Sequence, residues 1–239
     1  MNIDDITFMI CGPLHACGIE NIPYYLSKSI NIIYSTWTAN TQEEELLLDQ
    51  VKNLLSEENI IISEYMDVST FDNTQNVYYQ AWSWNQAVNI CKTKFCVKMR
   101  SDLKFEDIDP LIDAINEHSD KIIAISAFFR PCKVYYCPSD FVIGTLTEDA
   151  QEITITLLES LRKQVLHTIP AERKICFSIL DQRKLVPTWD EEECKKQMRK
   201  LYYIVDVNKL KPTLHWHKIG PFKCFIVGHH DCIDDINNF

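Results

Sequence analysis

The sequence predicts an α/β protein, in which a mostly parallel sheet is flanked by helices. Short apolar runs alternate with longer amphipathic segments along the first half of the chain, and several of these runs end at turn-forming or polar residues. Strands that alternate with helices are connected by crossovers, which favour parallel pairing. The 239 residues are 46% hydrophobic and 24% charged, which are globular proportions. We expect a single domain over 1–239, because no linker or internal repeat interrupts the chain.

The apolar runs of the first half predict strands. Residues 6–11 end at Gly12-Pro13, and residues 31–34 end at Ser35-Thr36-Trp37. The other predicted strands are 60–62, 95–99 and 121–126.

Amphipathic segments between these runs predict helices. Thr41, with Glu44 three residues later, has the pattern of a capping box and begins the first helix. Its predicted buried stripe consists of Leu46, Leu47, Val51, Leu54 and Leu55. Residues 77–91 predict a second helix and residues 107–117 a third. Trp82 and Trp84 point to different faces of the second helix, so one of them is expected in the core.

The second half of the chain is less regular. Residues 139–144 predict a strand that leads into a helix over 148–167. Pro170 begins another helix, since proline is favoured in the first turn. Residues 190–201 predict a charged helix, and two further strands are predicted at 202–205 and 222–227. The chain has five glycines and no glycine-rich phosphate loop, which argues against P-loop and dinucleotide-binding proteins.

Polar residues follow three of the predicted strands. In parallel α/β sheets, ligands bind beyond the carboxyl ends of the strands. Gly12-Pro13, Ser35-Thr36-Trp37 and Arg100-Ser101-Asp102 all stand at such ends, so we expect them to converge on one site.

Residues 98–102 carry the clearest chemical pattern. A strand-end carboxylate such as Asp102 can ligate Mg²⁺ or Mn²⁺, and a guanidinium such as Arg100 can hold a phosphate through two hydrogen bonds. Lys98 lies two residues earlier on the same strand face and is a further candidate. The alternative is structural, with Asp102 capping the next turn and Arg100 in a surface ion pair.

The ordered motifs resemble the WavE-type glycosyltransferases of surface-polysaccharide and lipopolysaccharide synthesis, which are similar to GT-A sugar-nucleotide transferases. The resemblance covers roughly residues 6–180. Residues 97–102 resemble the Lys-x-Arg-(Ser/Thr)-Asp signature that stands in for a DxD motif, although only one carboxylate is present. The other matching pieces are Gly12-Pro13 after the first strand, Ser35-Thr36-Trp37, the helix residues Asn76, Gln80 and Ser83, Ser139-Asp140-Phe141 with Gly144, and Pro170-Ala171-Glu172.

The resemblance implies a GT-A-like, Rossmann-like fold with a donor part at 1–105 and an acceptor part at 106–239. It implies metal-assisted transfer of a sugar from a nucleotide-diphosphate sugar to a hydroxyl of a glycan or glycoconjugate. Asp102 would hold Mn²⁺ or Mg²⁺. The expected donor-binding residues are Gly12, Pro13, Ser35, Thr36, Trp37, Gln80, Lys98, Arg100, Ser101 and Asp102.

Two carboxylates are candidates for the catalytic base. Glu172 opens a helix in a segment that resembles the family's Pro-Glu motif, although Ala171 interrupts it. The helix dipole would keep Glu172 ionised and weaken it as a base. Asp140 is the other candidate, or it could hold the hydroxyls of the donor sugar.

Two other functions stay open. The single carboxylate of Arg100-Ser101-Asp102 would also suit a nucleotide-sugar-binding protein without catalysis. A zinc protein could use a C-terminal cluster whose spacing fits no standard zinc finger. That cluster consists of His215, His217, Cys224, His229, His230, Asp231 and Cys232. The pairs Cys91 with Cys96 and Cys132 with Cys137 are more simply explained by burial.

Charge and cysteine content bear on partners and location. The formal net charge of −10 argues against nucleic-acid binding. Residues 160–239 nevertheless carry 14 Lys/Arg and 10 Asp/Glu, a net of +4. This part could face an anionic acceptor or contact a membrane surface peripherally. The acidic start, the lack of a long apolar run and ten cysteines together predict a cytoplasmic protein with reduced thiols.

Overall fold

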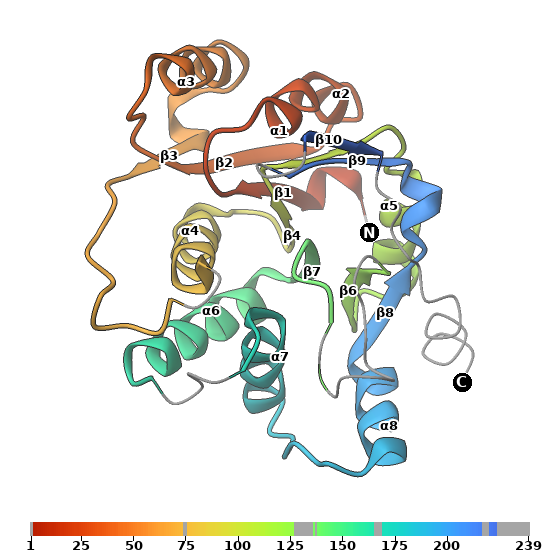
Figure 1. Cartoon of the computed structure of the whole chain (residues 1–239). Helices are drawn as coiled ribbons and strands as arrows, with labels where there is room; N and C mark the ends of the chain where they lie inside the picture. The colour runs from red at the N-terminus through yellow and green to blue at the C-terminus, as the bar shows by residue number, and fades with distance from the viewer. Residues whose placement is uncertain are drawn as a thin grey trace.

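The computed structural model describes residues 2–73, 76–126, 136, 138–164, 169–216 and 220–223, with backbone alone for 214–216 and 220–223. A seven-stranded sheet in the order β3-β2-β1-β4-β7-β6-β8 forms its centre (Figure 1). Its strands are β1 (Ile6–Cys11), β2 (Asn31–Trp37), β3 (Ile60–Ser63), β4 (Phe95–Arg100), β6 (Ile122–Ile125), β7 (Val142–Leu146) and β8 (Tyr202–Val205). The mostly parallel α/β fold predicted from the sequence is confirmed.

Strand β7 is the exception to the parallel arrangement, because it pairs antiparallel with both β4 and β6. All other pairs of this sheet are parallel. Because β7 runs in the opposite direction to β4, it begins at the edge of the sheet where β4 ends. Val142, the first residue of β7, is paired with Met99 near the end of β4. Residues just before β7 are therefore brought to the carboxyl edge of the sheet.

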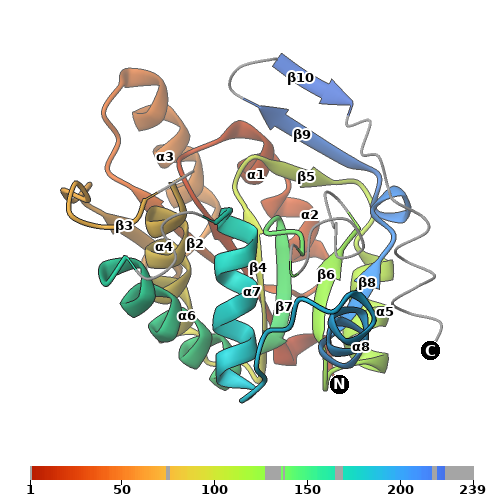
Figure 2. The ribbon, with the colours of Figure 1, turned by 60° about the horizontal axis from the view of Figure 1, so that its bottom comes forward.

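Helices cover both faces of the sheet (Figures 1 and 2). On one face lie α1 (Ala16–Glu20), α2 (Ile22–Ser27), α3 (Gln42–Leu54) and α5 (Asp109–Glu117). On the other lie α4 (Val77–Ile90), α6 (Thr147–Arg162), α7 (Ala171–Gln182) and α8 (Glu191–Leu201). None of the described helices is long and apolar enough to cross a membrane.

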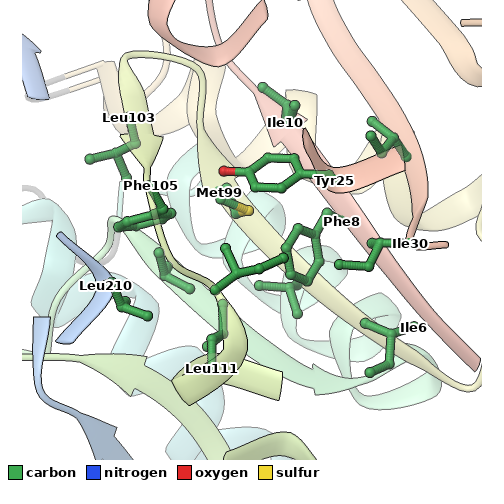
Figure 3. Packing of buried hydrophobic residues seen from close by; sticks show 14 of the residues in the cluster. Ile6, Phe8, Ile10, Tyr25, Ile30, Met99, Leu103, Phe105, Leu111 and Leu210 are labelled. Atoms are coloured by element: carbon green, nitrogen blue, oxygen red, sulfur yellow. The ribbon is translucent and has the colours of Figure 1, made fainter. Parts of the chain in front are cut away.

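The alternating side chains of β1 supply both cores. Ile6, Phe8 and Ile10 pack on the α1–α2 side, where Phe8 meets Tyr25 edge to face with ring centroids 5.3 Å apart (Figure 3). Met9 and Cys11 point to the opposite core. A strand buried on both faces has a continuous apolar sequence, which explains why 6–11 is so evident in the sequence.

A second, three-stranded sheet has the order β10-β9-β5. It consists of β5 (Leu103–Phe105), β9 (Pro212–Trp216) and β10 (Gly220–Lys223), and all its pairs are antiparallel. Strand β5 follows the end of β4 after only two residues. Short 3₁₀ turns at Ile3–Asp5, Glu57–Asn59 and Val207–Leu210 complete the described elements.

Several local expectations need correction. Leu46 is 60% exposed and does not belong to the buried stripe of α3, whose buried members are Leu48 and Val51. Thr41 accepts a hydrogen bond from the Glu44 amide as expected, but the Glu44 carboxylate caps the amide of Asn40 instead of Thr41. The strand predicted at 139–144 begins only at Val142.

Other boundaries also differ from the sequence-based expectation. The helix predicted to reach residue 167 ends at Arg162, and 165–168 lie outside the described residues. Part of the strand predicted at 222–227 is found in β10, while 224–227 lie outside the described part. In α4 the core tryptophan is Trp84, which is 1% exposed, and Trp82 is only partly buried.

Candidate functional site

Segments from four strands meet at the carboxyl edge of the sheet. The amide of Gly12, just after β1, donates to the carbonyl of Ser35 in β2 at 3.1 Å. The amide of Arg100, at the end of β4, donates to the carbonyl of Phe141 just before β7, also at 3.1 Å. The three strand ends predicted to converge therefore do so, and the Ser139-Asp140-Phe141 segment joins them.

The turn after β1 requires glycine. Gly12 has φ of +136°, and a Cβ there would lie 2.7 Å from the Ser101 hydroxyl oxygen. Gly18 in α1 approaches the same turn from the other side, since its Cβ would lie 2.5 Å from the Ser101 carbonyl oxygen. Ser101 is 3% exposed. Ser101, in the β4–β5 turn, therefore lies between two segments that each contribute a glycine. Pro13, which follows Gly12, is exposed.

Arg100 contacts the other charged side chains at this edge of the sheet. Its guanidinium donates to both carboxylate oxygens of Asp102, with Nε–Oδ1 at 3.0 Å and Nη2–Oδ2 at 2.6 Å. Nη1 lies 3.9 Å from Oδ2 of Asp140. The guanidinium carbon also lies 4.5 Å from the centroid of the Phe141 ring, a cation–π distance.

Three carboxylates act on the Arg100 guanidinium. Burial alone would lower the pKa of Arg100, but the hydrogen bond and charge of Asp102 outweigh it and raise that pKa, with further help from the charges of Asp140 and Glu172. Glu172 stands in the first turn of α7, whose N-terminal end lies beside the start of β7 (Figure 2). Both candidate bases therefore lie within electrostatic reach of Arg100.

Lys98 is turned into the protein. The side chain is 1% exposed, and its ammonium donates to the backbone carbonyl of Asp140. Burial lowers the pKa of Lys98, and the neighbouring charge of Arg100 adds to the effect. This hydrogen bond connects the end of β4 to the segment before β7, so Lys98 has a structural role beneath the site.

The predicted Ser35-Thr36-Trp37 segment is buried in the protein. The Ser83 hydroxyl of α4 donates to the carbonyl oxygen of Ser35 at 2.9 Å and lies 3.0 Å from the Ser35 hydroxyl. Thr36 is 1% exposed. Trp37 is 3% exposed and covered by tyrosines. Trp37 is therefore a core residue and does not itself offer an open stacking surface.

Two buried polar oxygens at this edge have no hydrogen-bond partner among the described residues. They are the hydroxyl oxygen of Thr36 and the amide oxygen Oε1 of Gln80. Gln80 lies one helical turn before Ser83, and α4 runs away from the carboxyl edge toward the start of β4. Buried polar atoms without partners are rare and destabilising, and a ligand can satisfy them.

An aromatic cluster beyond β2 and β3 was missed by sequence reasoning. The ring of Trp37 stacks on Tyr65 with centroids 5.1 Å apart and an interplanar angle of 22°. Tyr79 of α4 meets both rings edge to face. Tyr65 is 47% exposed and follows β3 by two residues, so its strand-end position was the signal that could have revealed it.

A fully buried ion pair connects the first turn of α7 to the segment before α4. Lys174 and Asp72 lie 2.6 Å apart, and both side chains are 0% exposed. The amide of Asp72 also donates to the carbonyl of Leu161 at the end of α6. Because Lys174 is two residues after Glu172, this pair fixes the part of α7 that carries the candidate base.

The described residues do not fit a divalent cation held by the protein alone. Both oxygens of Asp102 accept hydrogen bonds from Arg100. Within the part of the chain that the structure describes, no group of three His, Cys, Asp or Glu side chains gathers to hold a metal. The predicted Mn²⁺ or Mg²⁺ ligand Asp102 therefore has a protein partner of opposite charge.

Most of the C-terminal His/Cys cluster lies outside the described residues. This applies to His217, Cys224, His229, His230, Asp231 and Cys232, and to the pair Cys132 and Cys137, while His215 is described only as backbone in β9. Cys91 and Cys96 are free thiols. Cys96 is 0% exposed, and burial raises its pKa well above the usual value, whereas Cys91 is only partly buried.

Comparison with known proteins finds similarity among solved structures. No family model and no curated protein matches the chain. One similar solved structure is a glycosyltransferase. It is involved in the glycosylation of the major capsid of PBCV-1, and it is 16% identical, with a TM-score of 0.48 over 84% of this chain and 81% of that one. The residues of the site itself therefore carry the functional argument.

Proposed function

We propose that the chain is a glycosyltransferase that moves a sugar from a nucleotide-diphosphate sugar to the hydroxyl of a glycan or glycoconjugate. The observation that carries this proposal is the arrangement around Arg100. At the carboxyl edge of a mostly parallel sheet, the Arg100 guanidinium is hydrogen-bonded to Asp102 and lies 3.9 Å from Asp140. The charge of Glu172, from a third segment, also raises the pKa of Arg100. The motif resemblance of residues 97–102, 139–144 and 170–172 to WavE-type enzymes supports the same assignment.

Arg100 is the proposed contact to the donor diphosphate. Sugar transfer requires that the negative charge of the leaving diphosphate be neutralised, and a guanidinium can bind phosphate oxygens through two hydrogen bonds. Lys98 cannot take this role while its ammonium is bonded to the Asp140 carbonyl.

Glu172 is the proposed base and Asp140 the proposed contact to the donor sugar. A base must reach the hydroxyl of an incoming acceptor. Glu172 is only partly buried at the start of α7, whereas Asp140 is 5% exposed. Asp140 lies 3.9 Å from Arg100, the proposed phosphate contact.

The aromatic cluster of Trp37, Tyr65 and Tyr79 is proposed to receive the nucleoside. Tyr65 presents an exposed ring that is backed by Trp37, and a planar base can stack on such a ring.

A thermal-shift screen against nucleotide sugars and nucleoside diphosphates tests the donor site. At least one nucleotide should raise the melting temperature of the wild type, because a ligand that binds only the folded state stabilises it. The same ligand should have little effect on Arg100→Gln. If none of the nucleotides shifts the wild type, the donor-site assignment is wrong.

A nucleotide-sugar-binding protein without catalysis is the second candidate. It is favoured by one observation, that the single strand-end carboxylate Asp102 is already paired with Arg100. Donor cleavage distinguishes the two candidates, since a binding protein would retain the intact nucleotide sugar.

A further inference from the structure

Trp189 is an exposed tryptophan in the loop between α7 and α8 (Figure 2). Its side chain is 64% exposed, although tryptophan is on average among the more buried residue types. Single exposed apolar side chains are common on protein surfaces, so exposure alone assigns no role to it. The position of the ring and the way in which its loop is held carry the argument.

The loop between α7 and α8 runs back along α7 toward the first turn of that helix. At the C-terminal end of α7, the amide of Leu185 donates to the carbonyl of Leu180 at 2.8 Å. Four residues later, the ring centroid of Trp189 lies 5.8 Å from the guanidinium carbon of Arg173. Arg173 directly follows Glu172 in the first turn of α7. The loop therefore returns its exposed ring to the end of the helix that carries the proposed base.

Hydrogen bonds to buried structure fix the loop in front of Trp189. The side-chain amide of Gln197 donates to the carbonyl of Val186 at 3.1 Å, and the amide of Thr188 donates to the hydroxyl of Tyr136 at 2.8 Å. Tyr136 is 0% exposed, and its own hydroxyl donates to Oε1 of Gln197 at 2.8 Å. The exposed ring is thus held in place before any ligand arrives, which lowers the entropic cost of binding.

We infer that Trp189 is an acceptor subsite, on which one sugar of an oligosaccharide stacks while a hydroxyl of another sugar in the same chain meets Glu172. A fixed, exposed indole offers a flat apolar surface, and the C–H face of a pyranose ring is the complementary apolar surface of a glycan. Arg173 lies over the indole and supports it by a cation–π contact. The inference rests on the proposed function, because it takes Glu172 as the base that marks the acceptor side.

The position of the ring also predicts which acceptors are favoured. The side chain of Arg173 separates Trp189 from Glu172, so the stacked sugar is not the one that reacts. A single sugar cannot make both contacts. The site should therefore prefer an acceptor of several sugars to a monosaccharide.

Fluorine NMR of the full chain labelled with fluorotryptophan tests saccharide binding at this residue. Trp189→Phe identifies the Trp189 resonance by removing it. The probes are linear trisaccharides of glucose, galactose, mannose, N-acetylglucosamine and glucuronic acid. At least one of these trisaccharides should shift the Trp189 resonance of the wild type.

Variants then measure the contribution of the ring. For the trisaccharide that binds, calorimetry should show an affinity about tenfold lower in Trp189→Ala and within about threefold of the wild type in Trp189→Phe, which keeps an aromatic ring. Val186→Ala is the matched control, since Val186 is 79% exposed in the same loop, and it should bind as the wild type does. In transfer assays, Trp189→Ala should raise the KM for this trisaccharide with little change in kcat, because the ring touches no reacting atom.

The inference is wrong if no trisaccharide shifts the Trp189 resonance, or if Trp189→Ala binds the trisaccharide as tightly as the wild type. A shift caused by vesicles of phosphatidylcholine and phosphatidylserine, and by none of the trisaccharides, would overturn it in favour of a membrane contact. If the inference fails while nucleotide sugars still stabilise the wild type, the proposed function stands. If a trisaccharide binds at Trp189 but no nucleotide stabilises the wild type, the proposed function fails and Trp189 remains a glycan-binding residue.

Discussion

The two candidate bases at the carboxyl edge, Asp140 and Glu172, differ in exposure, and we assign their roles on this difference. Asp140 is 5% exposed and its backbone carbonyl is engaged by Lys98. Glu172 is partly exposed in the first turn of α7. A base that must meet an acceptor has to be reachable, so the more accessible carboxylate is assigned that role.

Replacing Glu172 by glutamine tests the assignment of the base. Turnover of the donor that binds should fall by about 100-fold or more, because general base catalysis contributes at least this much. The affinity for the donor, measured by calorimetry, should stay within the error of the wild-type value. Glu45→Gln, on the exposed side of α3, is the control and should change neither quantity. Near-normal turnover in Glu172→Gln together with loss in Asp140→Asn would assign the base to Asp140.

Tyr65 allows a second test at the scale of one side chain. Tyr65→Ala should weaken nucleoside diphosphate binding about tenfold, since stacking of a base on an aromatic ring contributes about 1–3 kcal/mol. Tyr65→Phe keeps the ring and should bind as the wild type does. Calorimetry with inorganic pyrophosphate gives the comparison, because this ligand lacks a base and should bind all three proteins equally. An equal loss for both ligands would contradict the stacking role.

At the scale of elements, the β4–β5 turn depends on close packing against its neighbours. Ser101 lies between the turn after β1 and helix α1, and both approaches are made by glycines. The amide of Gly18 donates to the Ser101 carbonyl at 2.9 Å. The position of Arg100 and Asp102, on either side of Ser101, follows from this packing.

Gly12→Ala should destabilise the protein by about 2 kcal/mol or more, because it adds a clash with the Ser101 hydroxyl to an unfavourable φ. In a Ser101→Ala background the same substitution should cost about 1 kcal/mol less, since the clashing oxygen is absent. Denaturant unfolding of the four proteins measures this coupling. Strict additivity would show that the clash relaxes elsewhere and that backbone strain alone sets the cost.

The buried pair of Asp72 and Lys174 fixes helix α7 against the segment before α4. Removing one member leaves a charge in an apolar environment, so Lys174→Met should destabilise the protein by about 3–5 kcal/mol. The double variant Asp72→Leu with Lys174→Met should be more stable than Lys174→Met alone, because apolar groups can replace a buried pair. Chemical unfolding checks both values. A double variant less stable than the single one would indicate that Asp72 is held mainly by its other contacts.

The elements that the sequence predicted well are those with a long apolar pattern. β1 and β4 are buried on both faces and consist mostly of apolar residues, so their ends, and hence part of the site, could be located. α1 and α2 have five and six residues, too few for a helical period to be visible. The direction of β7 could not be predicted, since a short apolar run has the same pattern in either direction.

The contacts within the site were harder to predict than its location. The Arg100–Asp102 pair depends on side-chain rotation at the end of β4, which spacing does not determine. Ser35 and Lys98 occupy the predicted strands, but their partners Ser83 and Asp140 lie 48 and 42 residues away in sequence. Such long-range pairing follows from the packing of helices on the sheet.

At the scale of the whole molecule, buried thiols and phenols make stability depend on pH. Burial raises the pKa of Cys11 from 9.0 to about 12 and raises that of Cys96 well above its usual value. Burial also raises the pKa of Tyr25 and Tyr34. These groups stay protonated in the folded chain while the unfolded chain ionises. Their stabilising contribution is therefore complete below pH 9 and is lost as the pH rises toward the folded-state values.

Cys11→Ala isolates one part of this alkaline destabilisation. Between pH 8 and about 10.5, the wild type should lose about 2 kcal/mol more unfolding free energy than the variant does, since the Cys11 thiolate forms only in the unfolded wild type. The buried Lys98 has the opposite effect on the pH dependence of stability, because burial lowers its pKa. Both proteins contain Lys98, so this effect cancels in the comparison. Urea unfolding at the two pH values measures the difference. Equal losses would show that Cys11 ionises in the folded protein.

The proposed function requires that this edge of the sheet cleave a nucleotide-diphosphate sugar. The most direct test is release of the nucleoside diphosphate from the donor that stabilises the wild type, followed by phosphorus NMR in the presence of Mn²⁺. We predict release by the wild type and its loss in both Arg100→Gln and Glu172→Gln. A wild-type protein that binds the nucleotide sugar and leaves it intact, with and without candidate acceptors, would contradict the proposed glycosyl transfer and identify a binding protein.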